Sequence, residues 1–307
     1  MNYTLHQLRI FSKIVEKQSV TKASEELYLT QPAVSIQLKN FQEQFPIPLT
    51  EVVGRKLFIT DFGQEIAQSA ERILSEVDGI NYRMQSYGGK IAGRLKVSVV
   101  STGKYVMPYF LSGFMRANTG VDLVMDVTNK ARVVQSLEQN EVDFALVSVL
   151  PEQLKLQKVN LMKNVLYLVA NPSHFKNIQL SKKMFVRDTP LIFREQGSAT
   201  RAAMESFLHQ ADIQVGKRIE LTSNEAVKQA VIAGLGCSIM PLIGIKNELG
   251  NGDLKIFQKK KLPIETTWNL VWLASKKLSP VATAFLEYLE TEKQKIITQE
   301  FDWYEKY

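Results

Sequence analysis

Apolar residues at three-to-four spacing predict three short helices at the start of the chain. The first carries one apolar stripe, formed by Leu5, Leu8, Phe11, Ile14 and Val15. Ser19 is suited to cap the second helix and Thr30 the third, because these hydroxyls accept hydrogen bonds from free backbone amides. Pro32 falls in the first turn of the third helix, where it removes no helical hydrogen bond.

The third predicted helix has two faces of different character. One face carries Val34, Leu38 and Phe41, and the opposite face carries Gln31, Pro32, Ser35, Ile36 and Lys39. This pattern fits a small three-helix bundle with a polar exposed side. It also fits a helix-turn-helix, in which small polar residues lead the second helix.

A hairpin and a long helix follow. Short strands flank Gly54-Arg55-Lys56, which describes either a wing lying along DNA phosphates or an ordinary solvated turn. Thr60 then opens a helix with an apolar seam spaced by four and three residues, formed by Ile66, Ala70, Ile73, Val77, Ile80 and Met84. The seam predicts a dimerising coiled coil, and the alternative is a helix packed on its own domain. Gly88 and Gly89 end the helix and are interpreted as a hinge.

From Gly93 onward the pattern changes to alternating strands and helices. We expect strands at 95–100, 123–127, 144–147, 166–170, 191–193, 219–221, 237–239 and 268–274. Helices are expected at 107–118, 133–139, 199–210, 224–233 and 280–292. This order implies parallel pairing in two α/β lobes with a ligand cleft between them. The apolar tail after Glu292 either folds back on its own domain or joins an oligomer contact.

Length and composition narrow the class of protein. A chain of 307 residues, 45% hydrophobic and 22% charged, suits two or three ordinary globular domains. No signal peptide opens the chain, and no stretch approaches the roughly 20 apolar residues that span a bilayer, so we expect a cytoplasmic protein. Cys237 is the single cysteine and the three histidines lack ligand spacing, so we expect no disulfide, metal or cofactor.

The net charge of +7 permits an acidic partner but does not locate one. Residues 1–60 hold seven basic and five acidic side chains, whereas residues 92–307 hold 28 and 21. The helical pattern, rather than basicity, therefore points to the N-terminal segment as a DNA reader.

Several segments, taken together, resemble the LysR-type transcriptional regulators over essentially the whole chain. They are 19–27 (SVTKASEEL), 30–38 (TQPAVSIQL), Pro48-Leu49, Gly54-Arg55-Lys56 and 59–63 (ITDFG). The resemblance implies an α/β chain with an all-α-rich winged helix-turn-helix at 1–62 and a dimerisation linker helix and hinge at 63–90. A two-lobe effector domain like that of periplasmic binding proteins would occupy 91–307, with the second lobe at about 165–268. DNA contacts are expected from Thr30, Gln31, Pro32, Ser35, Ile36, Lys39, Arg55 and Lys56.

The chain departs from the family pattern on the recognition helix and the wing. Ile36 stands where an arginine is usual, Thr50 and Val52 where Phe and Arg are usual, and Phe41-Gln42 where Leu-Glu is usual. The loss of two arginines weakens the expected contacts to phosphates and bases. The DNA sequence that is recognised and the affinity for it therefore stay open, whereas the expected fold does not change.

The second half narrows the resemblance. Segments 101–105 (STGKY), 194–201 (REQGSATR), 223–231 (SNEAVKQAV) and 234–237 (GLGC) resemble the branch that controls carbon-fixation genes. Its signals are small phosphorylated metabolites and nicotinamide nucleotides. Two of these segments place Ser and Thr residues beside a cation at the start of a helix, and both would face one cleft. Such a cleft would favour an anion. The alternative is that these hydroxyls only cap helices. The expected effector contacts are Ser101, Thr102, Lys104, Thr128, Ser148, Ser198, Thr200, Arg201 and Asn224.

We therefore expect a homodimeric or homotetrameric transcription regulator that binds double-stranded DNA and responds to a small anionic effector. RNA polymerase is a further candidate partner. A solute-binding protein of the same two-lobe fold is the main rival, and the missing signal peptide and the first 62 residues count against it. An enzyme is the third alternative, but no nucleophile–base set supports it.

Overall fold

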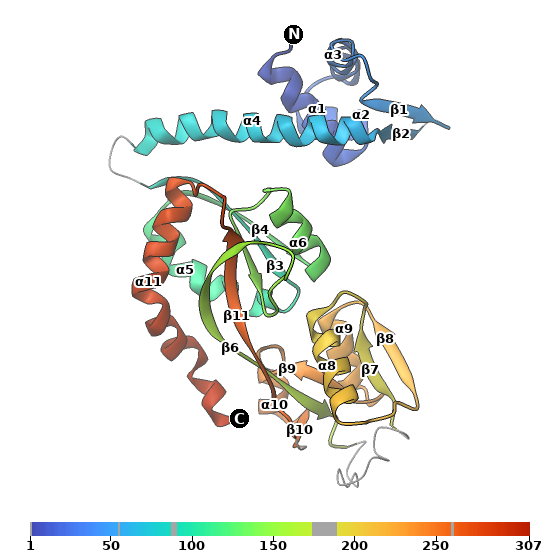
Figure 1. Cartoon of the computed structure of the whole chain (residues 1–307), viewed down its shortest axis with the longest axis vertical. Coiled ribbons are helices and arrows are strands. Elements are labelled where there is room, and N and C mark those ends of the chain that lie inside the picture. The colour runs from blue at the N-terminus through green and yellow to red at the C-terminus, as the bar shows by residue number, and fades with distance from the viewer. Residues whose placement is uncertain (1, 55, 87–90, 174–188, 259–260) are drawn as a thin grey trace. The chain divides into compact units, whose positions relative to one another are not determined.

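The computed structural model describes residues 2–54, 56–86, 91–173, 189–258 and 261–307. It divides into two compact units, Met1–Gly93 and Arg94–Tyr307. Figure 1 shows the elements of both units. The predicted wing-tip residue Arg55 and the predicted hinge glycines Gly88 and Gly89 lie outside the described residues, as does the side chain of Met84.

Three short helices open the first unit: α1 (Leu5–Lys17), α2 (Val20–Glu26) and α3 (Gln31–Gln42). Two of the predicted caps are confirmed. The Ser19 hydroxyl accepts from the Lys22 backbone amide at 3.3 Å, and the Thr30 hydroxyl accepts from that of Ala33 at 3.4 Å. These bonds satisfy amides that the helix itself leaves unpaired, so they fix where α2 and α3 begin.

Helix α1 is buried on two sides. Leu8 and Phe11 join a core with Phe41 and with α4 (Asp61–Ser86), while Ile10 and Ile14 join a second core with α2 and α3. The prediction of one buried apolar stripe on α1 is therefore too narrow. The helix is buried on two faces, because it lies between α4 and the other two helices. Leu5, at the edge of the stripe, remains 46% exposed.

Strands β1 (Thr50–Val53) and β2 (Lys56–Ile59) pair antiparallel and form the predicted wing. Helix α4 starts directly after β2, where the Thr60 hydroxyl accepts from the Gly63 amide at 2.9 Å. A Cβ atom at Gly63 would stand 2.1 Å from the Leu49 carbonyl oxygen, so only glycine permits this close approach. The ITDFG segment thus fixes the connection between wing and helix.

The first lobe of the second unit has the predicted alternation of strands and helices. Its elements are β3 (Ala92–Val100), α5 (Met107–Ala117), β4 (Gly120–Thr128), α6 (Lys130–Glu138) and β5 (Phe144–Val147). β3 pairs parallel with β5 and is flanked by β4 on its other side. Figure 1 shows α5 and the closing helix α11 (Pro280–Phe301) on one side of this sheet and α6 on the other.

Two long strands run from one lobe into the other. They are β6 (Leu156–Ala170) and β11 (Ile264–Leu273), which pair antiparallel along Leu156–Leu166 of β6. The last residues of β6 instead pair with β9 (Ser238–Pro241) and β10 (Lys255–Phe257) of the second lobe. Figure 1 shows these crossing strands as the connection between the two lobes.

The second lobe repeats the α/β pattern. It contains β7 (Leu191–Arg194), α8 (Ala199–Gln210), β8 (Arg218–Leu221), α9 (Asn224–Ile232) and α10 (Lys246–Asn251), with a short 3₁₀ helix, η2 (Leu242–Gly244). β7 and β8 pair in parallel, as predicted for a strand–helix–strand unit. The two-lobe α/β architecture is therefore confirmed.

Three elements differ from the sequence prediction. The strand expected at 166–170 is the end of a 15-residue strand. Its first five residues are exposed or half-buried without a regular alternation, so periodicity did not separate them from a loop. β11 begins four residues earlier than the expected 268–274. Helix α11 continues past Glu292 to Phe301, and its tail packs on its own domain. Among the described residues, no helix is both long and apolar enough to cross a membrane.

Candidate DNA-binding face and ligand site

The side of α3 that faces away from the core carries most of the residues predicted to contact DNA. Exposed there are Thr30, Gln31, Pro32, Ile36 and Lys39. Ser35 is half-buried, and its hydroxyl accepts a hydrogen bond from Gln31 Nε2 at 2.9 Å. The amide and the hydroxyl thus orient each other on the face where a recognition helix would meet base edges.

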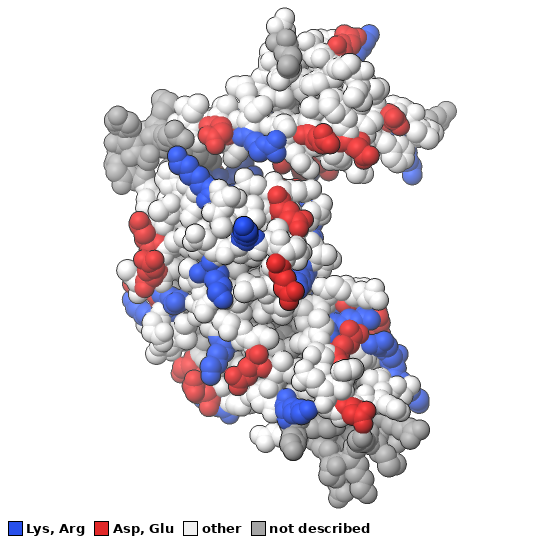
Figure 2. All heavy atoms as spheres, in the orientation of Figure 1, with Lys and Arg blue, Asp and Glu red and all other residues white. Residues whose placement is uncertain are grey.

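Charge alone does not mark this face. Lys13 Nζ lies 2.6 Å from Glu16 and 3.0 Å from Glu26, and Lys17 pairs with the same two carboxylates. The hydrogen bond to Glu16 raises the pKa of Lys13 despite partial burial. Figure 2 likewise shows acidic and basic side chains interspersed on the face it presents. Two basic residues of the first unit, Lys13 and Lys17, are therefore paired with carboxylates of the same unit.

The wing presents apolar side chains beside one described cation. Val52, Val53 and Phe58 are 71%, 61% and 50% exposed, and Lys56 is exposed as well. Val53 is directly opposite Lys56 in the ladder, so both side chains point to the same side. The wing can thus meet DNA through the Lys56 charge and through apolar contact with the sugars of the backbone.

Two of the departures from the family pattern are partners in the structure. Gln42 Oε1 accepts hydrogen bonds from the Thr50 backbone amide at 3.1 Å and from Thr50 Oγ1 at 2.9 Å. The pair joins the last residue of α3 to the first residue of β1. It therefore holds the wing in a fixed orientation to the recognition helix.

The predicted dimer seam on α4 needs a correction at its beginning. Ala70 is 1% exposed and Ile66 is half-buried, and both pack into the core around Leu8 and Phe11. Ala70 is therefore covered within its own unit and is not available to a partner helix, whereas Ile66 is covered only in part. Ile73 and Ile80 remain 41% and 57% exposed, with Val77 half-buried between them.

In the second unit, the predicted ligand contacts of the first lobe lie where strands end. Ser101 and Thr102 follow β3, Thr128 ends β4, and Ser148 follows β5, which is parallel to β3. Thr102 is 7% exposed and begins the 3₁₀ helix η1 (Gly103–Tyr105), yet its hydroxyl caps no backbone amide. The interpretation of this residue as a mere cap therefore does not apply.

The second-lobe residues lie at the starts of α8 and α9. Ser198 caps α8, accepting from the Arg201 amide at 3.5 Å, and Thr200 is 9% exposed within the first turn. Asn224 opens α9 and is 2% exposed, and its Nδ2 atom has no hydrogen-bond partner. A buried amide donor without an acceptor is costly, by about 1–3 kcal/mol, and marks a place where an acceptor is needed.

Arg201 has a different role from the one predicted. Its guanidinium donates to Glu205 at 2.9 Å, to Glu220 at 2.8 Å and to the Arg194 carbonyl at 2.9 Å. The side chain is 8% exposed, and the hydrogen bond to Glu205 raises its pKa. These partners engage the guanidinium, so it ties α8 to β7 and β8 and is not a free cation for a ligand.

The lobes meet at a cluster in which the sequence had singled out only Asn224 as a contact. A Cβ atom on Gly244 of η2 would stand 3.0 Å from Asn224 Nδ2 and 3.2 Å from the Tyr105 ring. The Tyr105 hydroxyl also donates to Glu225 Oε2 at 3.4 Å. Tyr105 belongs to the first lobe and the other three residues to the second. Asn224 was a predicted effector contact, Tyr105 and Glu225 lie within the segments that carry the family resemblance, and Gly244 had no sequence signal.

Electrostatics favour this contact between the lobes. Burial by itself would raise the pKa of Glu225, but hydrogen bonds from Gln229 and Lys228 and the charges of Lys228 and Lys104 lower it. Glu225 is therefore ionised at neutral pH. Lys104, which also lies 5.0 Å from the Tyr105 ring centre, provides the attracting charge from the first lobe.

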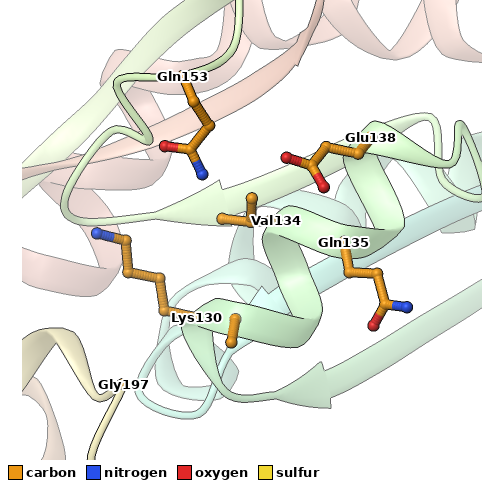
Figure 3. A pocket seen from close by; sticks show the side chains of 7 residues that line it. Lys130, Val134, Gln135, Glu138, Gln153 and Gly197 are labelled. Carbon is orange, nitrogen blue, oxygen red and sulfur yellow. The ribbon is translucent and has the colours of Figure 1, made fainter.

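One open pocket of about 340 Å³ lies between α6 and the loop that precedes α8. Figure 3 shows Lys130 and Gln153 approaching it from opposite sides, with Val134 between them. None of the predicted ligand contacts lines it, although Lys130 follows Thr128 by two residues and Gly197 directly precedes Ser198. The pocket therefore lies beside Thr128 and Ser198 in the sequence, but neither of these residues lines it.

A winged helix-turn-helix followed by a two-lobe α/β domain defines a class of DNA-binding transcription regulators. Two family models place the chain within that class. The model of bacterial regulatory helix-turn-helix proteins of the LysR family matches residues 5–64, and the LysR substrate binding domain matches residues 88–294. The chain belongs to the LysR family.

Similar proteins agree with the predicted branch. The chain is 35% identical to the transcriptional activator CmpR of Synechocystis over 94% of its length and 95% of that protein. It is 36% identical to the RuBisCO operon transcriptional regulator of Acidithiobacillus ferrooxidans, over 93% of both chains. These relatives are named regulators rather than enzymes, and they confirm the resemblance to the carbon-fixation branch.

Solved structures agree with the fold. The regulatory domain of CcmR from Synechocystis, in complex with 2-PG, has a TM-score of 0.60 and 31% identity, covering 68% of this chain and 99% of that one. Full-length OxyR from Pseudomonas aeruginosa has a TM-score of 0.68 over 97% of this chain and 95% of its own, at 20% identity. The second similarity supports the fold alone.

Proposed function

We propose that the chain regulates transcription in response to a small anion bound between the two lobes of its second unit. The contacts would be Ser101, Thr102, Lys104, Thr128 and Ser148 from the first lobe and Ser198, Thr200 and Asn224 from the second. A ligand held by both lobes stabilises one lobe arrangement over another, which is the requirement for a signal to reach DNA.

The observation that carries this proposal is a buried amide donor without an acceptor, together with a buried hydroxyl that caps no helix amide. The Thr102 hydroxyl caps no amide, and Asn224 Nδ2 has no acceptor. Oxygen atoms of an anion would satisfy both, with Lys104 providing charge. The 2-PG ligand of the related CcmR domain, a small phosphorylated carboxylate, has the same chemistry.

The remaining partners are proposed from the same family membership. Two chains would pair through the exposed part of α4, as a homodimer or within a homotetramer, so that two recognition helices read two half-sites of double-stranded DNA. RNA polymerase is a further proposed partner. A DNA-binding regulator of bacterial genes is expected in the cytoplasm, where its target is.

A gel-shift titration with the DNA upstream of the protein's own gene tests this function. We expect a specific complex whose affinity or mobility changes when 2-phosphoglycolate is added. DNA binding that ignores 2-phosphoglycolate, phosphorylated sugars and nicotinamide nucleotides alike would refute the response to an anion. Failure to bind any DNA with two half-sites would refute the regulator as described.

A further inference from the structure

The last seven residues of the chain, Phe301–Tyr307, contact both lobes of the second unit. Phe301 ends α11 and is 3% exposed. Its ring centre lies 5.2 Å from that of Tyr109 in an edge-to-face arrangement and 6.1 Å from that of Phe110 in a stacked one. Tyr109 and Phe110 belong to α5, so this end of the segment is anchored in the first lobe.

The residues beyond Phe301, in the 3₁₀ helix η3 (Asp302–Lys306), contact the second lobe. Trp303 is 7% exposed, and Lys246 Nζ of α10 lies 4.9 Å from its ring centre. The Tyr307 carbonyl accepts a hydrogen bond from the Tyr167 hydroxyl at 2.5 Å. Tyr167 pairs with Met240 of β9, in the part of β6 that belongs to the second lobe.

Tyr304 brings the segment to η2, the element that lies against Asn224 of the proposed ligand site. Its hydroxyl is buried beside the backbone of Ile243 and has no hydrogen bond of ordinary geometry, and burial raises its pKa. Ile243 is the middle residue of η2, and the next residue is Gly244, which fits between Tyr105 and Asn224. The three-residue helix η2 therefore touches the C-terminal segment at Ile243 and the proposed ligand contact Asn224 at Gly244.

We propose that the segment Phe301–Tyr307 is a brace that sets the resting angle between the lobes and thereby regulates the ligand site. The inference rests on the proposed function for its biological meaning, but not for its mechanics. Because the segment is anchored on α5 at Phe301 and on the second lobe at Trp303 and Tyr307, rotation of one lobe against the other works against one of these two sets of contacts. The brace thus adds to the free-energy difference between lobe arrangements, which a ligand must overcome or exploit.

If the segment acts as a brace, two kinds of substitution should have opposite effects on the mobility of the lobes. Trp303→Ala removes the contact to Lys246, and Tyr167→Phe removes the hydrogen bond to Tyr307 while keeping its ring, so both should loosen the lobes. Tyr304→Phe removes a buried hydroxyl that has no good partner, so it should tighten them. Tyr167→Phe lies outside the segment and keeps the test valid if Trp303→Ala folds poorly.

Spin labels on Gln135→Cys of α6 and Gln210→Cys of α8 would report the inter-lobe distance in the full-length chain without ligand. Both positions are exposed, whereas the native Cys237 is buried. Labelled chains are diluted into unlabelled protein so that each distance lies within one chain. We expect a second distance, populated roughly fivefold more in the loosening variants, as loss of one cation–aromatic contact gives. Tyr304→Phe should narrow the distribution.

An unchanged distance distribution in both loosening variants overturns the brace. A change in sedimenting mass without a change in distance would place the segment in an oligomer contact and overturn it as well. Adding 2-phosphoglycolate to the same samples separates the two proposals. Distances that respond to the variants but not to that ligand leave the brace intact and count against the proposed function.

Discussion

At the scale of single residues, Thr102 and Asn224 differ from the other Ser, Thr and Asn residues at helix starts. Ser19, Thr30, Ser198 and Ser223 all cap backbone amides, so their place in the sequence is explained by helix formation. Thr102 and Asn224 are as buried as core residues, yet neither has such a task. The proposed ligand would provide the acceptor that Asn224 Nδ2 lacks among the described residues.

Replacing Thr102 with valine keeps the shape of the side chain and removes its hydroxyl. We expect ligand affinity to fall by about 1–3 kcal/mol, because one hydrogen bond to an anion is lost, with little change in unfolding temperature. Calorimetry with 2-phosphoglycolate measures the first and thermal denaturation the second. Thr298→Val, on the exposed side of α11, is the matched control and should bind as the wild type does. Equal affinity in Thr102→Val would remove this residue from the site.

Arg201→Ala should act on stability rather than on the ligand. The guanidinium holds Glu205, Glu220 and the Arg194 carbonyl, so its loss should destabilise the second lobe by about 1–3 kcal/mol. Urea unfolding measures this effect. A variant of native stability that has lost affinity for an anion would show instead that Arg201 contacts the ligand directly.

At the scale of elements, local chemistry determined which predictions succeeded. Helix α8 has the predicted bounds because Ser198 and the apolar spacing mark them, and the wing was predictable from its turn. The sequence pattern could not reveal that α1 covers Ala70, because the same apolar spacing fits an internal core or a dimer seam. It also could not reveal η2, whose role depends on contacts with Tyr105 and Asn224 made by the folded chain.

The two ends of the α4 seam should respond differently to a charge. Ile73→Asp places a carboxylate on the exposed part of the helix, so it should give folded monomers, since a dry interface does not tolerate an unpaired charge. Ala70→Asp places it in the core of the first unit and should unfold that unit. Sedimentation and circular dichroism separate the two results. An unchanged mass for Ile73→Asp would exclude this part of α4 from the interface.

The wing should contribute binding energy without selecting sequence. Lys56→Ala should weaken binding to all DNA sequences alike and lower the slope of log affinity against log salt by about one, because one phosphate contact is lost. Ile36→Arg, on the exposed side of α3, should instead change which sequence is preferred. Binding titrations at several salt concentrations measure both effects. A change of sequence preference in Lys56→Ala would contradict this assignment.

At the scale of the whole molecule, function depends on coupling between parts that the sequence shows only as separate patterns. The family membership establishes a DNA-binding unit and a two-lobe unit. Within the second unit, the lobes are joined by β6 and β11, by the contact of Tyr105 with Gly244 and Glu225, and by the C-terminal segment. These three connections limit how far a bound ligand can move one lobe relative to the other.

Calorimetric titration of the full-length protein tests the central claim most directly. The ligands are 2-phosphoglycolate, a phosphorylated sugar, a nicotinamide nucleotide and, as a neutral comparison, glycerol. The account predicts saturable binding of at least one anion at one site per chain, and none of glycerol. Binding of glycerol as tight as that of the anions, or no binding of any anion, would contradict an anion site between the lobes.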